Sequence, residues 1–235
     1  MVSSGVPQGT VLGPILFLIH INDLPLTVNS QVRLFADDCL LYRQIHSIQD
    51  QLQLQQDLKS LEKWADDWGM SFNAKKCYIM TIRKKTTFFY RLNNHILETV
   101  SSIPYLGVKI SEDLKWSEHI GTITKKASST LGFMRRNLRS CPTECRRAAY
   151  FSLVRSKLEY SASVWDPYYQ TDIDRIEQIQ RRAARFICND YKSRHEGAVT
   201  NMLNTLQLQP LQERRKHQRL ALLYKISAQG LKANS

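Results

Sequence analysis

The sequence lacks any apolar stretch long enough to cross a membrane. Its longest apolar run, Val11 to Ile21, has 11 residues and contains Gly13, Pro14 and His20, whereas a membrane-spanning helix needs about 20. No lysine or arginine precedes this run, because the first basic residue is Arg33, so we expect no secretory signal peptide. We therefore exclude a membrane role and predict that the apolar run is buried inside a folded protein.

Cysteine is sparse and unevenly placed. The cysteines are odd in number and scattered: Cys39, Cys77, Cys141, Cys145 and Cys188. This distribution favours a reducing compartment over a disulfide-linked scaffold. A zinc site would have to combine Cys141, Cys145, Cys188 and His195, whose spacing matches no common zinc-binding pattern. We therefore expect ordinary thiols.

Acidic residues are too few to balance the basic ones. The 235 residues contain 33 Lys and Arg against 21 Asp and Glu, a net charge of +12. The imbalance is local, since residues 1–60 carry 3 basic against 5 acidic side chains and residues 121–235 carry 21 against 9. The 43% of hydrophobic residues is ordinary for a folded protein. We infer two regions with different roles, the second of which faces a polyanion.

The first part of the chain mixes short strands with one helix. Two apolar segments within residues 32–44 flank a pair of turn-forming residues, which predicts a tight hairpin. Apolar residues then recur at steps of three and four over residues 47–69, as on an amphipathic helix with Trp64 and Trp68 in the core. Strand-like segments follow at 78–82, 88–92, 95–97 and 103–110, with a turn at Asn93-Asn94. The predicted fold class is α+β.

Beyond residue 115 the pattern is helical. Helices are expected over residues 117–138, from Pro142 towards Tyr160, over 172–187 and over 211–226, with Ser117 as a capping residue. The positions predicted to face outward are basic: Lys125, Lys126, Arg135, Arg136, Arg139, Arg146, Arg147, Arg181, Arg182, Arg185, Arg214, Arg215, Lys216 and Arg219. A single arginine of this kind is usually just solvated, but so many in one region favour contact with nucleic acid.

Asp37 and Asp38 are the strongest local indication of chemistry. At the tip of a tight hairpin both carboxylates can approach one cation, and hard oxygen ligands favour Mg²⁺. Such an ion supports phosphoryl or nucleotidyl transfer. An isolated Asp-Asp pair is more often a polar turn, because Asp is favoured in turns in any protein. The surrounding sequence must therefore distinguish a metal-binding pair from an ordinary polar turn.

Four segments around this pair resemble, in order, successive motifs of reverse transcriptases. They are SGVPQGTVLGP at 4–14, FADD at 35–38, FNAKKC at 72–77 and YLGV at 105–108. INDLP at 21–25 and QRRAAR at 180–185 extend the resemblance over essentially the whole chain, and are similar to non-LTR retrotransposons of the LINE and jockey type. The resemblance implies part of a polymerase palm at residues 1–114 and a helical thumb at residues 115–235.

The resemblance also implies a role for each motif. Asp37 binds the catalytic metal ion, Mg²⁺ or Mn²⁺, with Asp38 in support. Lys76 lies near the triphosphate, and Lys75, one residue off the pattern, is the alternative. The implied contacts to the incoming nucleotide and template are Gly5, Pro7, Gln8 and Gly9, and those to the primer end are Tyr105, Leu106 and Gly107. The implied nucleic-acid contacts of the helical region are Lys125, Lys126, Arg135, Arg136, Arg181, Arg182 and Arg185. The implied partners are an RNA template, a DNA primer and deoxynucleoside triphosphates, inside the cell in the nucleus or the cytoplasm.

The same resemblance predicts a limit on activity. The family carries another metal-binding Asp on a strand before the Gly-Val-Pro-Gln-Gly segment, whereas the only carboxylate upstream of Asp37 here is Asp23. We therefore expect a fragment that binds primer-template duplex without extending the primer. The alternative is a non-catalytic, maturase-like module that binds RNA or duplex. A telomerase-like or group II intron polymerase fits the same residues less well.

Overall fold

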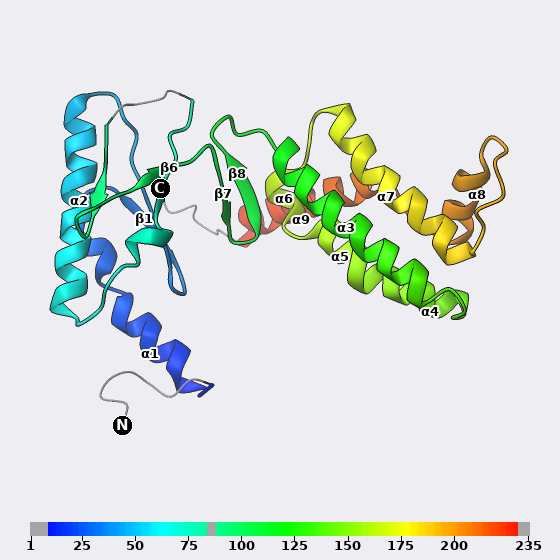
Figure 1. Cartoon of the computed structure of the whole chain (residues 1–235), viewed down its shortest axis with the longest axis horizontal. Coiled ribbons are helices and arrows are strands. Elements are labelled where there is room, and N and C mark those ends of the chain that lie inside the picture. Colours follow the sequence, from blue (N-terminus) through cyan, green and yellow to red (C-terminus); the bar gives the residue numbers. More distant parts are fainter. Residues whose placement is uncertain (1–8, 84–87, 230–235) are drawn as a thin grey trace. The chain divides into compact units, whose positions relative to one another are not determined.

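The computed structural model describes residues 9–83 and 88–229, and the chain forms two compact units, residues 1–101 and residues 102–235 (Figure 1). Helices and small two-stranded sheets occur in the chain, so the expected α+β class is confirmed. In the part of the chain that is described, no helix is both long enough and apolar enough to span a bilayer.

The described residues of the first unit form two longer helices and three small sheets. Its elements are α1 (Leu12–Ile21), β1 (Gln31–Phe35), β2 (Asp38–Tyr42), α2 (Ile48–Asp67), β3 (Tyr78–Ile79), β4 (Arg91–Leu92), β5 (His95–Ile96) and β6 (Glu98–Thr99). β1 pairs with β2 and β4 with β5 in antiparallel hairpins, while β3 and β6 are parallel. The turn predicted at Asn93-Asn94 is present, with both residues at positive φ, as a type I′ hairpin turn requires.

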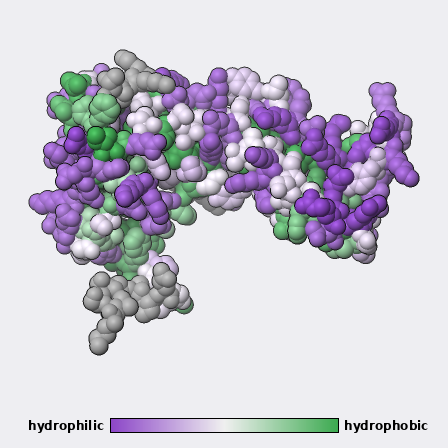
Figure 2. All heavy atoms as spheres, in the orientation of Figure 1, coloured by the Kyte–Doolittle hydropathy of each residue, from purple (hydrophilic) through white to green (hydrophobic). Residues whose placement is uncertain are grey.

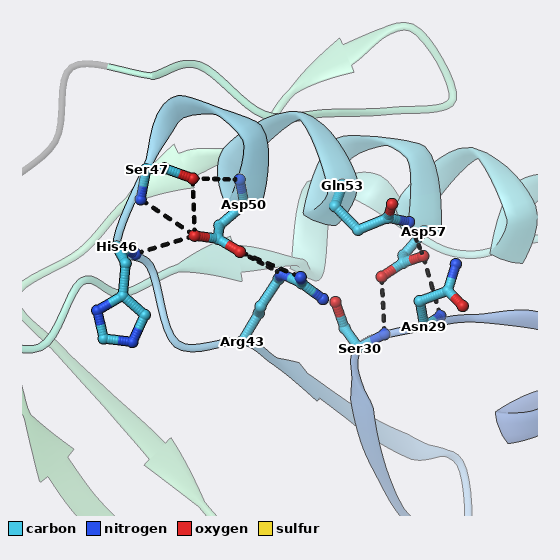
Figure 3. Close-up of polar contacts among 8 residues, drawn as sticks. All are labelled: Asn29, Ser30, Arg43, His46, Ser47, Asp50, Gln53 and Asp57. Carbon is cyan, nitrogen blue, oxygen red and sulfur yellow. Dashed lines mark hydrogen bonds and ion pairs between the residues drawn. The ribbon is translucent and has the colours of Figure 1, made fainter.

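Helix α2 carries the core of this unit. It begins after Ser47, whose hydroxyl accepts a hydrogen bond from the Asp50 backbone N–H while the Asp50 carboxylate accepts one from the Ser47 backbone N–H, a complete capping box (Figure 3). Leu61 and Trp64 on its inner face pack against Val32 of β1. The hairpin β1–β2 is thereby fixed on α2.

A buried carboxylate on α2 fixes the start of β1. Asp57 is 1% exposed, and it accepts hydrogen bonds from the backbone N–H groups of Asn29 (3.1 Å) and Ser30 (2.8 Å) and from the Gln53 amide (3.0 Å) (Figure 3). Burial by itself raises the pKa of this carboxyl, but the hydrogen bonds outweigh it and the pKa lies below its ordinary value. Asp57 is therefore ionised at neutral pH.

Two predictions about apolar residues of the first unit are wrong. The run Val11–Ile21 forms α1, but its apolar side chains are largely exposed, with Leu12 at 64% and Ile19 at 68%. Trp68 is 49% exposed, because α2 ends there and the chain turns at Gly69. Trp64 is buried as predicted, and its indole N–H donates to the carboxylate of Asp23.

The second unit is a helical assembly preceded by one hairpin. Its elements are β7 (Ser102–Tyr105), β8 (Val108–Ser111), α3 (Ser117–Asn137), α4 (Thr143–Ala149), a π-helical segment (Tyr150–Arg155), α5 (Ser156–Glu159), α6 (Ala162–Trp165), α7 (Gln170–Cys188), α8 (Ala198–Thr205) and α9 (Leu211–Gln229). The strand predicted at 103–110 is thus a hairpin. Ser117 makes no capping bond; its hydroxyl donates instead to Asp172 on α7, at 2.6 Å.

The core of the second unit follows from the periodicity of α3 and α7. Ile120 and Met134 of α3 and Ile176 and Ile187 of α7 are fully buried, in one cluster that also includes Trp165. Because apolar residues occupy one face of each helix, charged residues are left on the other. Figure 2 shows that hydrophilic side chains cover most of the visible surface of this unit.

Substitution of Asp57 tests whether its carboxylate anchors β1. We expect Asp57→Ala to lower the free energy of unfolding by about 2–4 kcal/mol, because it leaves the buried Ser30 backbone N–H and the part-buried Asn29 backbone N–H without their acceptor. Asp57→Asn, which keeps one acceptor oxygen, should lose less. Urea denaturation followed by tryptophan fluorescence measures both, with Asp67→Asn on the exposed end of α2 as the control.

The pH dependence of stability gives a second readout of the same group. The pKa of Asp57 is lowered in the folded protein, so its contribution is complete above the unfolded pKa and is lost as pH falls through the folded pKa. The wild type should therefore lose stability in acid more steeply than Asp57→Asn. Equal acid profiles for the two proteins would contradict this assignment.

Candidate functional site: an acidic hairpin and a basic helical surface

The two predicted metal-binding carboxylates lie at the tip of the β1–β2 hairpin. Phe35 pairs with Asp38, so the turn consists of Ala36 and Asp37 alone, and Ala36 has a φ of 51°. Asp37 lies in the turn and Asp38 is the first residue of β2. Both side chains are exposed, and neither carboxylate has a hydrogen-bond or ion-pair partner among residues 9–83 and 88–229. They are free to bind a cation.

Packing behind the tip restrains these carboxylates. Val32 is buried against Leu61 and Trp64 of α2, and Leu34 and Leu41 pack on the same cluster. Because side chains alternate across a strand, the residues between them face away from the core. The acidic tip therefore projects from a hairpin whose other end is anchored.

The predicted triphosphate contact, Lys76, lies in a short 3-10 turn at Ala74–Lys76 and is exposed. Its neighbour Cys77 packs on the core cluster that also contacts Leu41 of β2. Cys39 retains exposed surface, yet desolvation of its thiol raises the pKa to about 11, and the nearby Cys77 thiol adds to the rise. The segment that follows Lys76 and the strand that follows Asp37 are therefore neighbours.

The glycine-rich segment is described only in part. Gly9 has a φ of 83°, a backbone conformation that glycine adopts without strain. Gly5, Pro7 and Gln8 lie outside the described residues. Their predicted contacts to nucleotide and template stay predictions.

The predicted primer-binding residues form the turn of the β7–β8 hairpin. Tyr105 pairs with Val108, and the two turn residues Leu106 and Gly107 have φ values of 48° and 81°. A Cβ added at Gly107 would lie 2.9 Å from the ring of Tyr160, whose hydroxyl donates to the Leu106 carbonyl at 3.2 Å. Sequence reasoning missed Tyr160, because it lies more than 50 residues away in the chain.

A histidine ties the same hairpin to helix α3. The imidazole Nδ1 of His119 accepts a hydrogen bond from the Lys109 backbone N–H at 3.1 Å. His119 is 3% exposed, and its burial, together with the charge of Lys126, lowers its pKa. It is therefore neutral at pH 7, as an accepting Nδ1 requires.

The basic residues predicted to contact nucleic acid lie on α3 and α7, which pack against each other. Lys125, Lys126, Arg135, Arg136, Arg181 and Arg182 are exposed, and Arg185 is partly buried with a hydrogen bond to the Asp190 carbonyl. None of the seven forms an ion pair within the described part of the chain. Their charge is available to a polyanion.

Three arginines predicted to face outward have structural contacts instead. Arg146 is 7% exposed and donates to the carbonyls of Ile187 and Arg139. Arg215 is fully buried and pairs with Asp166 at 2.8 Å, and Arg214 pairs with Glu159. The prediction of outward orientation was wrong for these residues because it considered one helix at a time, whereas α4 and α9 each pack on neighbouring helices.

Comparison with known proteins shows what this chain is similar to. Residues 1–110 match the model described as reverse transcriptase (RNA-dependent DNA polymerase), a range that ends just after the β7–β8 turn. The chain is related to the reverse transcriptases of non-LTR retrotransposons. The resemblance inferred from the sequence motifs is therefore confirmed.

Curated relatives extend the similarity beyond the family model. The chain is 28% identical over 202 residues to the RNA-directed DNA polymerase from mobile element jockey of Drosophila melanogaster, which covers 79% of the chain and 22% of that protein. It is 28% identical over 200 residues to the probable RNA-directed DNA polymerase from transposon BS of the same species, with 78% and 22% covered. The chain thus spans about a fifth of the length of these relatives. No solved structure matches.

The turn of the β7–β8 hairpin provides a direct test of the local geometry. Gly107→Ala should lower the free energy of unfolding by about 1–3 kcal/mol, because an L side chain is strained at positive φ and the new Cβ would contact Tyr160. Adding Tyr160→Ala to Gly107→Ala removes the contact between the new Cβ and the Tyr160 ring. The backbone strain at positive φ remains in this double variant. Gly121→Ala, at an ordinary position of α3 where the new Cβ would be in normal van der Waals contact with the Arg175 side chain at 3.8 Å, is the control and should not destabilise. Equal stability of Gly107→Ala and Gly121→Ala in thermal denaturation would contradict the turn.

Proposed function

We propose that this chain contributes the metal-binding hairpin and a nucleic-acid-binding helical region to RNA-directed DNA synthesis. The observation that carries the proposal is the exposed Asp37-Asp38 pair at the tip of an anchored hairpin, where neither carboxylate has a partner among the described residues, within a stretch related to reverse transcriptases. Residues 1–114 would be part of the palm, and residues 115–235 the thumb and the region that follows it.

The donor set at the hairpin suits a divalent cation. Carboxylate oxygens are hard ligands, and Mg²⁺ is commonly held by one or two carboxylates with the rest of its shell from water and substrate phosphates. Asp37 would be the principal ligand of Mg²⁺ or Mn²⁺ and Asp38 would support it. Such an ion would supply activation of the primer hydroxyl and stabilisation of the leaving pyrophosphate.

The remaining motif residues would act on the substrates. Lys76 would place a positive charge near the triphosphate, and Gly5, Pro7, Gln8 and Gly9 would lie along the incoming nucleotide and the template. The Tyr105–Gly107 turn, which is tied to α3 through His119, would hold the primer end. A role on RNA and DNA implies an intracellular location, in the nucleus or the cytoplasm.

The hairpin supplies two carboxylates, and the residues described in the structure contain no cluster of three metal-binding side chains. Two Mg²⁺ ions need more negative charge than one such pair provides. We therefore expect the isolated chain to bind a primer-template duplex without extending the primer. Extension of a labelled primer on an RNA template by the isolated chain, abolished in Asp37→Ala, would overturn this expectation.

The catalytic proposal is tested in a chimera. Residues 1–235 replace the matching stretch of the jockey polymerase, and incorporation is measured on an RNA template with Mg²⁺. The chimera should extend the primer, and Asp37→Asn should lower its rate at least about a hundredfold, because it weakens electrostatic stabilisation at the reacting phosphate. Asp66→Asn, an exposed carboxylate on α2, is the matched control and should be near wild type. Equal rates for Asp37→Asn and Asp66→Asn would contradict the role of the hairpin.

Salt dependence tests the helical region separately. Contacts between basic side chains and phosphates release counterions, so duplex affinity should fall steeply as salt rises. Replacing Lys125 and Arg182 with Gln should reduce the slope of log affinity against log salt by about two. Arg175→Gln is the control, because Asp172 pairs with that guanidinium at 3.5 Å on the same helix as Arg182. A duplex affinity that is independent of salt would contradict the thumb assignment.

A further inference from the structure

A pocket at one end of the helical unit is lined by residues that belong neither to the acidic hairpin nor to the primer-binding turn. It has a volume of about 400 Å³, within the range of pockets that bind small ligands. Arg135 and Arg136 of the last turn of α3, and Arg139 just beyond it, line the pocket together with Asn189 and Tyr191 after α7. The pocket therefore brings together two segments about 50 residues apart in the chain.

The end of α7 determines the shape of the pocket. Asn189 has a φ of 52° and its backbone N–H donates to the carbonyls of Arg185 and Phe186, which closes the helix in a left-handed cap. The reversed chain brings Tyr191 back towards α3, so that the Arg135 guanidinium carbon lies 4.7 Å from the centroid of the tyrosine ring. This is a cation–π contact.

The charge of the pocket is uncompensated. No carboxylate forms an ion pair with Arg135, Arg136 or Arg139 within the part of the chain that the structure covers. The nearby Asp190 is already engaged, because it accepts hydrogen bonds from the hydroxyl and backbone N–H of Ser193, which lower its pKa. A favourable interaction with the helix dipole accounts for basic residues in the last turn of α3. The dipole interaction does not account for Arg139, which lies beyond that turn. It also does not account for the position of all three arginines around one pocket.

The ring of Tyr191 indicates which kind of anionic ligand the pocket binds. Tyr191 is 40% exposed, so part of its ring remains open beside the guanidinium of Arg135. A planar ring next to guanidinium groups suits a nucleotide, since bases stack on aromatic and arginine planes while phosphates bind to arginine forks. A base inside a duplex is already stacked on its neighbours and cannot occupy such a position. The ligand must therefore present an unpaired base.

We propose that this pocket binds one unpaired nucleotide of a single-stranded nucleic acid. Its base stacks on the Arg135–Tyr191 pair and its phosphate contacts Arg136 and Arg139. The proposal rests on the proposed function of the helical region and adds to it a discrimination between single strands and duplex. Such a site would hold the unpaired part of a template or displaced strand next to the duplex on α3 and α7.

The test compares three labelled oligonucleotides by fluorescence anisotropy on the full chain: an oligothymidine, an abasic strand of the same length, and a blunt duplex. Tyr191→Ala should weaken oligothymidine binding about tenfold, the effect of losing one stacked base, and should leave abasic-strand and duplex binding near wild type. Tyr191→Phe, which keeps the ring, should bind like the wild type. Arg136→Gln should weaken both single strands.

Matched controls separate the pocket from general charge and from misfolding. Tyr224→Ala removes a tyrosine of α9 that is more exposed than Tyr191, at 73% against 40%, and should change none of the three affinities. The proposal is overturned if Tyr191→Ala weakens the abasic strand as much as oligothymidine, if it changes neither, or if Tyr191→Phe loses as much as Tyr191→Ala. Failure of the wild type to bind the duplex would instead refute the proposed function of the helical region, a result that is distinguishable from an unchanged preference for single strands.

Discussion

The carboxylate of Asp57 fixes where β1 begins, and the position of the acidic hairpin depends on that. Its hydrogen bonds hold Asn29 and Ser30 at the end of the loop, so Val32 meets the apolar face of α2 in one register. A slip of one residue would exchange the two faces of the strand. It would bury charged or polar groups and redirect the turn that carries Asp37. A buried polar contact far from the tip thus controls which way the candidate metal ligands point.

In the helical unit, buried cationic side chains need polar partners just as the buried carboxylate of Asp57 does. A buried arginine must be paired or hydrogen-bonded, because an unpartnered charge in a protein interior is costly. Arg215 meets this requirement only at its Nε, which pairs with Asp166, because its two terminal nitrogens are buried without a hydrogen-bond partner among the described residues. Arg146 meets it through two backbone carbonyls. These residues fasten α9 and α4 to their neighbours. Arg135, Arg136, Arg181 and Arg182 of α3 and α7 form no ion pair within the described residues and are exposed. Burial thus distinguishes the arginines that stabilise the fold from those proposed to contact nucleic acid.

Particular elements show how far the sequence could be interpreted. The β1–β2 hairpin, the extent of α2 and the basic faces of α3 and α7 follow from local patterns, because turn residues and a repeat of three to four residues act between near neighbours in the chain. Exposure of α1 did not follow, since an apolar run looks the same whether or not another element covers it. Tyr160 and Tyr191 were also missed, although the left-handed cap residue Asn189 and the basic cluster at 135–139 were signals that could have pointed to the pocket.

The sequence by itself determined the reverse transcriptase relationship, the location of an acidic pair in a tight turn and the confinement of excess positive charge to the helical region. Only the tertiary structure decided which arginines are buried, what contacts the Leu106-Gly107 turn and how Arg135 comes to lie over Tyr191. The physical reason is the separation along the chain between the residues that interact. Periodicity and turn preference depend on residues a few positions apart, whereas Arg215 and Asp166 are 49 residues apart and interact only because α6 and α9 pack together.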